Sequence, residues 1–396
     1  MSARICRGSR SDLAGTCPPR LTGGIEEGSR AVLTYQDLIR YARGPTPEKP
    51  LPAIWDFFPC HAAAVGGVPN FLDYYFSVET KLRLQQKLQS SLPEALILPG
   101  VFPDLGVVVE ASAFGGQALW FENGAPFIGP TLREPADVDH LRVPPAGLAG
   151  LMPLALTQRE MMRRTLLASG HEMEQFAFSM GPAEIAALLI GYDKYYLMLY
   201  DDPNRMKRLM EIATETVLGW LAKQAQCYGG VTVLIIGEHV FHQMRPDQTR
   251  EFLLPYLQAI FGAFPHAIRI YHNEGRHAEE HIATVLELGA DIWHFGSDVH
   301  PLETLYPRIG DRIILFGGLN PHGVMRHGTP EDVRAETRAV LGTARGRKLI
   351  LSTGTGTTPE TTLENQRAMV QATITDWRSP LASPPMSKAG NGLGFV

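Results

Sequence analysis

The chain has 396 residues, 44% of them hydrophobic and 19% charged, and its formal net charge at pH 7 is −5. This hydrophobic content supports an ordinary core and excludes a disordered chain, while the negative charge argues against nucleic acid as a partner. No run of about 18 uninterrupted apolar residues occurs, so no membrane span is expected. Residues 1–30 carry no periodic pattern and are predicted to be a flexible lead. Residues 379–396 are predicted to be a flexible tail, which leaves 31–378 as one domain.

Short apolar runs recur along the domain, each followed by a Gly/Pro-containing turn. Most are continuous rather than alternating, as is typical of strands that are covered on both faces. The eight predicted strands are 53–55, 95–98, 176–179, 231–236, 267–271, 291–295, 312–316 and 348–352.

Amphipathic segments lie between these runs. The predicted helices are 203–227, 247–262, 277–288, 330–341 and 360–376. The last two are preceded by Thr329-Pro330 and Thr358-Pro359, which offer a Thr N-cap with proline at the first helical position.

Eight strands alternating with helices predict an α/β fold, a single closed (β/α)8 TIM barrel. The alternative is an open, doubly wound sheet, which is disfavoured because no G-x-G-x-x-G follows the first strand. A long insertion, 99–173, separates the second and third strands. It is predicted to hold a hairpin turning at Asn123-Gly124 and one further helix.

In a barrel of this kind the active site lies at the carboxyl ends of the strands. His272 and Glu274 are two residues apart at such an end, so their side chains point to the same side. Glu238 follows the neighbouring strand. Imidazole nitrogen and carboxylate oxygen are ligands that zinc accepts, so these three residues are predicted metal ligands. The alternative is a buried polar network in which the carboxylates bind substrate hydroxyls.

Other residues at the strand ends are assigned to the substrate. Phe57 and Phe58 follow the first strand and could form an aromatic wall, although core packing is the default for such rings. His239 is as compatible with capping a loop as with contacting substrate. Cys60 and His61 are adjacent and face opposite ways, which favours a packed thiol over a nucleophile with its base. Four cysteines without a CxxC pair indicate reduced thiols and a cytoplasmic location.

Several motifs, taken in order, carry a family resemblance. They are Gly181-Pro182, Asp202-Pro203, the stretch from Arg245-Pro246 to Pro255-Tyr256, Gly317-Gly318-Leu319-Asn320-Pro321 and Ser352-Thr353-Gly354-Thr355-Gly356 followed by Thr362-Leu363-Glu364-Asn365. From about residue 33 to 377 the chain resembles the uroporphyrinogen decarboxylase superfamily. This superfamily includes porphyrinogen decarboxylases and zinc-dependent methyltransferases that exchange methyl groups with corrinoid proteins or thiols. The resemblance implies a (β/α)8 barrel.

The chain departs from the decarboxylase branch after the first strand. That branch has Arg-Gln-Ala-Gly-Arg there, which holds the substrate carboxylates, whereas this chain has Asp56-Phe57-Phe58-Pro59-Cys60. An acidic residue would repel a tetracarboxylate, so porphyrinogen decarboxylation is not expected.

The methyltransferase branch has His-x-Cys after the fifth strand and Gly-Cys-Gly after the last. Here His272-Asn273-Glu274 retains the histidine and replaces the first cysteine by glutamate, and Gly354-Thr355-Gly356 replaces the second by threonine. A site of histidine and carboxylate ligands makes zinc a stronger Lewis acid than thiolates do. This favours polarisation of an ether oxygen, so that a methyl group leaves for a strong nucleophile.

The resemblance therefore implies a zinc-dependent methyltransferase, acting on a small methylated donor such as a methoxylated aromatic compound. The methyl acceptor would be a corrinoid (cobalamin) carried by a separate partner protein. Zinc would be held by Glu238, His272 and Glu274. Asp56, Asp298 and Asn320 would act as catalytic residues, and Thr355 would bind substrate with Phe57, Phe58 and His239.

Two other functions stay open from the sequence. One is a metal-independent decarboxylase or lyase acting on a different substrate, and the other is a non-catalytic protein that binds a tetrapyrrole or corrinoid partner. A homodimer is also left open.

Overall fold

The computed structural model of the chain describes residues 32–47 and 49–377. The predicted lead, 1–30, and the predicted tail, 379–396, lie outside the described residues. From Val32 onward the described chain forms one compact unit. Within it no helix combines the length and hydropathy needed to cross a membrane.

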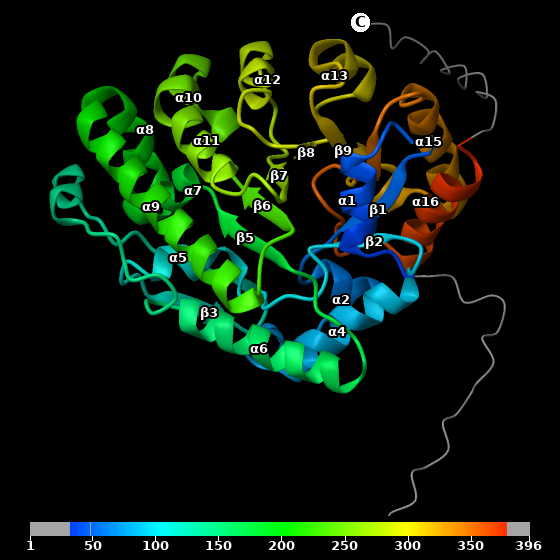
Figure 1. Ribbon diagram of the computed structural model, residues 1–396, viewed down its shortest axis with the longest axis horizontal. Helices are drawn as coiled ribbons and strands as arrows, with labels where there is room; N and C mark the ends of the chain where they lie inside the picture. Colours follow the sequence, from blue (N-terminus) through cyan, green and yellow to red (C-terminus); the bar gives the residue numbers. More distant parts are fainter. Residues whose placement is uncertain (1–31, 48, 378–396) are drawn as a thin grey trace, which may run out of the picture. The chain divides into compact units, whose positions relative to one another are not determined.

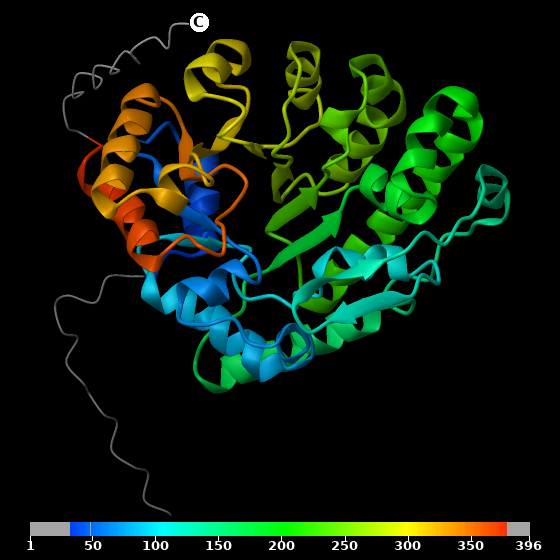
Figure 2. The same ribbon diagram turned by 180° about the vertical axis from the view of Figure 1, so that it is seen from behind.

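All eight predicted strands form, and they make one parallel sheet with helices around it (Figures 1 and 2). The strands are β1 (Leu51–Trp55), β2 (Leu96–Leu98), β5 (Phe176–Met180), β6 (Val233–Gly237), β7 (Ile268–His272), β8 (Ile292–His294), β9 (Ile314–Leu319) and β10 (Leu349–Thr353). Their order is β2-β1-β10-β9-β8-β7-β6-β5, the order of a (β/α)8 barrel. The α/β barrel fold is therefore confirmed.

The insertion between β2 and β5 holds the predicted hairpin, β3 (Ala118–Phe121) paired antiparallel with β4 (Gly124–Ile128). It also holds more helical structure than the single helix predicted. The helical segments of the insertion are η1 (Gly106–Val108), α5 (Val109–Ser112), η2 (Pro135–His140) and α6 (Met152–Ala168).

The remaining helices follow the strands. They are α1 (Tyr35–Arg43), α2 (Cys60–Ala64), α3 (Phe71–Phe76), α4 (Val78–Ser91), α7 (Pro182–Ile190), α8 (Tyr192–Asp201), α9 (Pro203–Tyr228), η3 (Phe241–Gln243), α10 (Pro246–Phe252), α11 (Leu254–Gly262), α12 (Glu279–Val285), α13 (Leu302–Ile309), α14 (Val324–His327), α15 (Pro330–Thr343) and α16 (Leu363–Thr375).

Two helix predictions needed correction. The segment 247–262 is two helices, because Pro255 lacks an N–H and its ring clashes with the preceding turn, so the helix is interrupted at Leu253. The last helix is capped by Thr362, not by Thr358, whose backbone N–H instead donates to Thr361. The Thr329 cap is confirmed: its hydroxyl accepts from the Asp332 N–H.

Side chains alternate between the two faces of the sheet. Those facing inward form an apolar core that includes Trp55, Ile235, Ile270 and Phe316, whereas their neighbours pack outward against the helices. Tyr35 and Leu38 of α1 join the inner core. The Lys348 ammonium donates to the carbonyls of Ala42 and Gly44. Helix α1 thus closes the amino-terminal end of the barrel and leaves the carboxyl end for a site.

The ring of strands is not continuous, in contrast to the closed barrel predicted. Strand β2 pairs only with β1, and β5 pairs only with β6. We call the gap between β2 and β5 the seam. The insertion leaves the sheet at the β2 side of the seam and returns to it at the β5 side.

Two glutamine side chains bond to the backbone on either side of the seam. Gln224 of α9 accepts from the Phe178 N–H at 3.2 Å and donates to the Phe178 carbonyl at 2.9 Å. Gln85 of α4 accepts from the Phe102 N–H at 3.1 Å and donates to the Phe102 carbonyl at 3.0 Å. A primary amide offers the same donor and acceptor as a peptide group, so each glutamine replaces one residue of a missing strand.

Replacing Gln224 by methionine tests this role. Gln224→Met preserves the shape of the side chain but leaves the part-buried N–H and carbonyl of Phe178 without this partner, so we expect a loss of about 2–4 kcal/mol in the free energy of unfolding. Urea denaturation measures it. Gln226→Met, an exposed position on the same helix, should change stability by less than about 0.5 kcal/mol. Equal stabilities of the two variants would contradict the assignment.

A buried carboxyl group lies next to the seam. Glu110 of α5 is 3% exposed, and its Oε1 accepts from the Met180 N–H at 3.3 Å. Burial raises the pKa of Glu110 to about 7. The folded chain therefore favours the neutral form of this carboxyl group.

This pKa predicts how stability depends on pH. Because the pKa of Glu110 is higher in the folded than in the unfolded chain, its contribution is fully present below about pH 4.5 and is lost as pH rises through about 7. Glu110→Gln keeps the acceptor but cannot ionise. The stability difference between variant and wild type should therefore shift by up to about 3 kcal/mol in favour of the variant between pH 4.5 and pH 8. A difference independent of pH would contradict the prediction.

Candidate functional site

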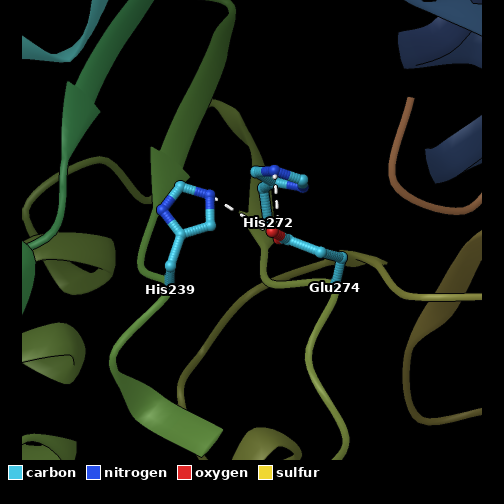
Figure 3. Close-up of side chains that lie close together, drawn as sticks. All are labelled: His239, His272 and Glu274. Atoms are coloured by element: carbon cyan, nitrogen blue, oxygen red, sulfur yellow. Dashed lines mark ion pairs between the residues drawn. The ribbon is translucent and has the colours of Figure 1, made fainter. Parts of the chain in front are cut away.

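Three side chains converge at the carboxyl ends of β6 and β7. His272 is the last residue of β7, Glu274 follows two residues later, and His239 lies in the loop after β6 (Figure 3). One ligand atom from each of the three lies within 4.8 Å of the others. Among the described residues this is the one group of three or more such side chains with this spacing.

The spacing suits a small cation. Glu274 Oε2 lies 3.4 Å from His272 Nε2 and 3.6 Å from His239 Nε2. Bonds of about 2.0–2.1 Å in a tetrahedral zinc site place neighbouring ligand atoms about 3.3–3.4 Å apart. Glu274 Oε2 is also buried without a hydrogen-bond partner. The residues therefore fit a zinc ion, with a fourth position left for another ligand.

Glu238 does not join this group, although it was predicted as a ligand. It directly precedes His239 in the loop after β6. The Glu238 carboxylate accepts from the Ala183 N–H at 2.9 Å, at the start of α7. A Cβ atom on Gly181 would lie 2.3 Å from Glu238 Oε2, so only glycine fits at this turn. The Gly181-Pro182 motif thus leaves room for a glutamate that caps the helix.

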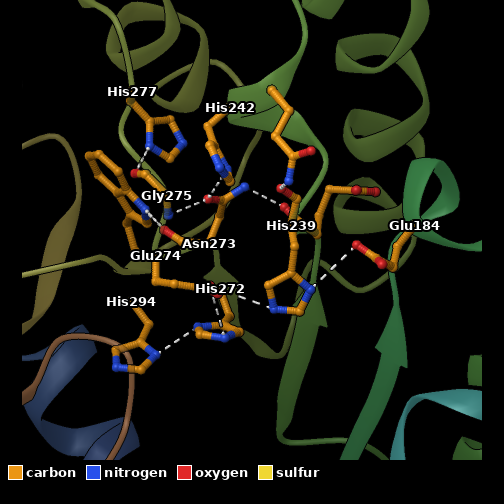
Figure 4. A network of polar contacts seen from close by, with 12 residues as sticks. Glu184, His239, His242, His272, Asn273, Glu274, Gly275, His277 and His294 are labelled. Atoms are coloured by element: carbon orange, nitrogen blue, oxygen red, sulfur yellow. Dashed lines mark hydrogen bonds and ion pairs between the residues drawn. The ribbon is translucent and has the colours of Figure 1, made fainter. Parts of the chain in front are cut away.

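Glu184 of α7 orients His239, and its role was not foreseen from the sequence. Its Oε2 lies 3.4 Å from His239 Nδ1 (Figure 4), and its other oxygen accepts from the Tyr192 hydroxyl. With Nδ1 directed to Glu184, Nε2 of His239 faces Glu274. The available signal was the position of Glu184 two residues after the Gly181-Pro182 motif.

Charge is distributed unevenly between the two histidines. Burial opposes protonation of His239, but Glu184 and Glu274 raise its pKa to about 9. Burial lowers the pKa of His272 to about 4, against the attraction of Glu274. Burial raises the pKa of Glu274, but the two histidines more than offset it and lower the pKa overall. At neutral pH one imidazolium therefore lies between two carboxylates, while His272 is neutral.

His294 of β8 fixes the tautomer of His272, which again was not foreseen. His294 Nε2 lies 3.2 Å from the Thr353 carbonyl, an acceptor only, so this nitrogen carries the hydrogen. Burial lowers the pKa of His294 well below its usual value, so the ring is neutral and its Nδ1 has a lone pair. That lone pair accepts from His272 Nδ1 at 2.8 Å (Figure 4). The lone pair of His272 is therefore on Nε2, facing Glu274.

Removing this hydrogen bond should weaken metal binding. His294→Phe keeps an aromatic ring beside Trp55 and Phe316 but no longer orients His272, so we expect zinc affinity to fall by about 10–100-fold. Competition with a chromophoric chelator measures this affinity. His266→Phe, at an exposed histidine before β7, is the matched control and should bind zinc like the wild type. Unchanged affinity in His294→Phe would refute the role of His294.

The loop after β7 is held rigid by Asn273, which is fully buried. Its amide donates to the Glu238 carbonyl, and its oxygen accepts from the Gly275 N–H at 2.9 Å and contacts His242 Nδ1 at 3.0 Å. A Cβ on Gly275 would overlap the His242 ring, 2.0 Å from Nδ1. These contacts fix the backbone on both sides of Glu274.

The other predicted polar residues lie apart from this cluster. Asp298 is exposed in the turn after β8. Asn320 Oδ1 accepts from the backbone N–H groups of His322 and Gly323, both at 2.9 Å, so this side chain stabilises its own loop. Thr355 is half-buried in the loop after β10.

Asp56 is buried directly after β1, and burial raises its pKa to about 8. The nearest donors are the Thr357 hydroxyl and the N–H groups of Phe57 and His61, but neither carboxylate oxygen forms a hydrogen bond of good geometry. Burial, with the charge of Asp56, also raises the pKa of the Cys60 thiol to about 12. Cys60 is therefore a thiol rather than a thiolate at neutral pH.

The two phenylalanines predicted to contact substrate, Phe57 and Phe58, lie in different parts of the core. Phe57 packs with the inner core, 5.4 Å from the Trp55 ring centroid. Trp55 in turn lies 4.8 Å from the His272 ring. Phe58 instead stacks on Tyr74 at 3.8 Å in the outer core. Only Phe57 is thus on the side of the barrel interior.

The family model of uroporphyrinogen decarboxylase (URO-D) matches residues 37–375, nearly the whole described chain. The chain belongs to the uroporphyrinogen decarboxylase family. This confirms the resemblance drawn from the motifs.

Relatives named uroporphyrinogen decarboxylase are distant in sequence. The protein from Cellvibrio japonicus is 27% identical over 292 residues, which cover 69% of this chain and 76% of the relative. The protein from Synechococcus sp. is 25% identical over 352 residues, covering 85% of this chain and 95% of the relative. A methyltransferase from Methanosarcina mazei superposes with a TM-score of 0.69 at 21% identity, covering 87% of this chain and 99% of that chain. At that identity the superposition establishes the shared fold.

Proposed function

We propose that this protein is a zinc-dependent methyltransferase that moves a methyl group from a small methylated donor to a corrinoid carried by a separate protein. The observation that carries the proposal is the convergence of His239, His272 and Glu274, in which Glu274 Oε2 lies 3.4 Å from His272 Nε2 and 3.6 Å from His239 Nε2. The structural similarity to a methyltransferase is in keeping with it.

His239, His272 and Glu274 would hold the metal. When bound, zinc supplies a Lewis acid that draws electron density from an ether oxygen of the donor. Glu184 and His294 keep the facing nitrogens of the two histidines directed to one point. Trp55, 2% exposed and in contact with both His272 and His294, excludes water from the interior side of the site.

In the proposed reaction the nucleophile takes the methyl carbon, and the electron pair of the broken C–O bond stays on the donor oxygen. That oxygen then takes up a proton. Burial raises the pKa of Asp56 to about 8, so this carboxyl group holds a proton at neutral pH. Its position directly after β1 favours Asp56 as the proton donor.

The residues after β1 argue against a porphyrinogen substrate. Phe57 lies there on the interior side, and the buried residue before it is Asp56. A tetracarboxylate would need cationic side chains at these positions to bind its carboxylates. A methoxylated aromatic ring, by contrast, is compatible with the apolar interior formed by Trp55 and Phe57.

The test combines metal analysis with a methyl-transfer assay. We expect purified protein to bind one zinc ion per chain and to convert free cob(I)alamin to methylcobalamin with members of a panel of aryl methyl ethers, as followed by absorbance. His272→Ala and Glu274→Gln should lose both zinc and transfer, because each removes a ligand. Glu279→Gln, an exposed carboxylate on α12, is the matched control and should keep both.

Glu238→Gln distinguishes the two candidate third ligands. The amide can still accept from the Ala183 N–H, so we expect this variant to keep zinc, whereas His239→Ala should lose it. Methyl transfer that persists in chelator would contradict the proposal. Metal-independent release of CO2 from a carboxylate substrate would instead support the lyase alternative.

A further inference from the structure

A cavity of about 90 Å³ lies in the wall of the barrel at the seam, apart from the metal-ligand cluster. Four phenylalanines face each other across it: Phe57 and Phe102 from the side of β1 and β2, and Phe176 and Phe178 from β5. Phe102 lies 5.7 Å from Phe57 and 6.3 Å from Phe176 between ring centroids. Trp220 of α9 also lines the cavity, and Val107, 44% exposed, lies at its rim. The seam therefore encloses an aromatic pocket that opens at η1.

The two acidic residues that line the pocket are already engaged. Asp104 accepts from the Gly106 N–H at 2.9 Å and from the Tyr74 hydroxyl at 3.3 Å. Glu110 accepts from the Met180 N–H. Burial raises the pKa of both groups, so neither is an uncompensated anion waiting for a cation.

Arg159 is the charged side chain in the pocket that lacks a counter-ion. It is 4% exposed, and its guanidinium lies 3.5 Å from the centroid of the Tyr228 ring. Its Nη2 donates to the Glu174 carbonyl at 2.7 Å, and among the described residues no carboxylate forms an ion pair with it. The adjacent Glu160 is paired with Arg163 and Arg164 on the outside of α6. A buried cation without an anion is costly, so an anionic partner would be favoured here.

We propose that the seam pocket binds a small aromatic carboxylate, with its ring among the phenylalanines and its carboxylate on Arg159. The observations point to an anion because Arg159 is the unpaired charge, and to a ring because aromatic side chains form the walls. The cavity is smaller than the apolar cavity of about 150 Å³ that holds benzene in another protein, so no group larger than one six-membered ring is expected in it.

The pocket is close enough to the metal-ligand cluster for the two to communicate. Phe57 lines the pocket and contacts Trp55, and Trp55 contacts His272. A molecule bound in the pocket would therefore restrict the motion of Phe57. Through Phe57 it would also restrict the Trp55 ring, which contacts the candidate metal ligand His272. The proposal does not depend on the metal, since none of the three candidate ligands lines the pocket.

Titration calorimetry with sodium benzoate tests the proposal on the full chain. We expect saturable binding at one site per chain, unchanged by chelator and by His272→Ala. Arg159→Gln removes the charge but can still donate to the Glu174 carbonyl, and it should weaken benzoate binding at least tenfold. Arg163→Gln, at a half-buried arginine one turn along the same helix that pairs with Glu160, is the matched control and should bind within about twofold of wild type.

Two further probes separate the ring from the charge. Acetate lacks the ring and benzyl alcohol lacks the charge, so each should bind the wild type at least tenfold more weakly than benzoate does. Ala155→Phe, whose new ring would fill the cavity, should abolish benzoate binding while circular dichroism shows an intact fold. The proposal is overturned if benzoate does not bind, or if it binds Ala155→Phe as tightly as the wild type. It is equally overturned if folded Arg159→Gln keeps wild-type affinity.

Discussion

Burial of titratable groups away from solvent is the constraint on which the carboxyl end of this barrel depends. His272, His294, Glu238 and Asp56 are all less than one-tenth exposed. Burial of such groups costs free energy, and the structure offsets this cost in two ways. Neutral groups are joined by hydrogen bonds, and charged groups are arranged so that positive and negative charges alternate. Glu184, protonated His239 and Glu274 form such an alternation, with one positive charge between two negative ones. A divalent cation that displaced the proton of His239 would leave this group electrically neutral, so the charge pattern and the ligand spacing favour the same occupant.

The strand pattern made the fold predictable, because a parallel barrel strand is buried on both faces and therefore appears as a continuous apolar run. The failures were local. Pro255 interrupts a segment whose amphipathic pattern continues across it, and Thr362 rather than Thr358 caps the last helix. The open seam was not predictable from propensity, since β2 and β5 are as apolar as paired strands. The side chains that bond to the backbone beside the seam, Gln85 and Gln224, lie 17 and 46 positions from their partners Phe102 and Phe178.

Only those site residues that are close together in the sequence were predictable. His272 and Glu274 lie on one side of a strand end because they are two residues apart, and the structure brings them together. The choice between Glu238 and His239 could not be made from spacing, since it depends on which side chain α7 needs as a cap. Glu184 and His294 act through contacts across 55 and 22 positions of sequence, distances at which no periodicity operates. Histidine inside the apolar run of β8 was the one visible sign.

The end of β6 has a consequence for which changes the following turn tolerates. Two successive residues there have different roles: Glu238 caps the start of α7, and His239 joins the candidate ligand cluster. Insertion or deletion of one residue would move at least one of the two side chains out of its position, and the space beside Gly181 fits the Glu238 carboxylate only while that position holds. The length of this turn is therefore constrained together with the two residue types that it carries.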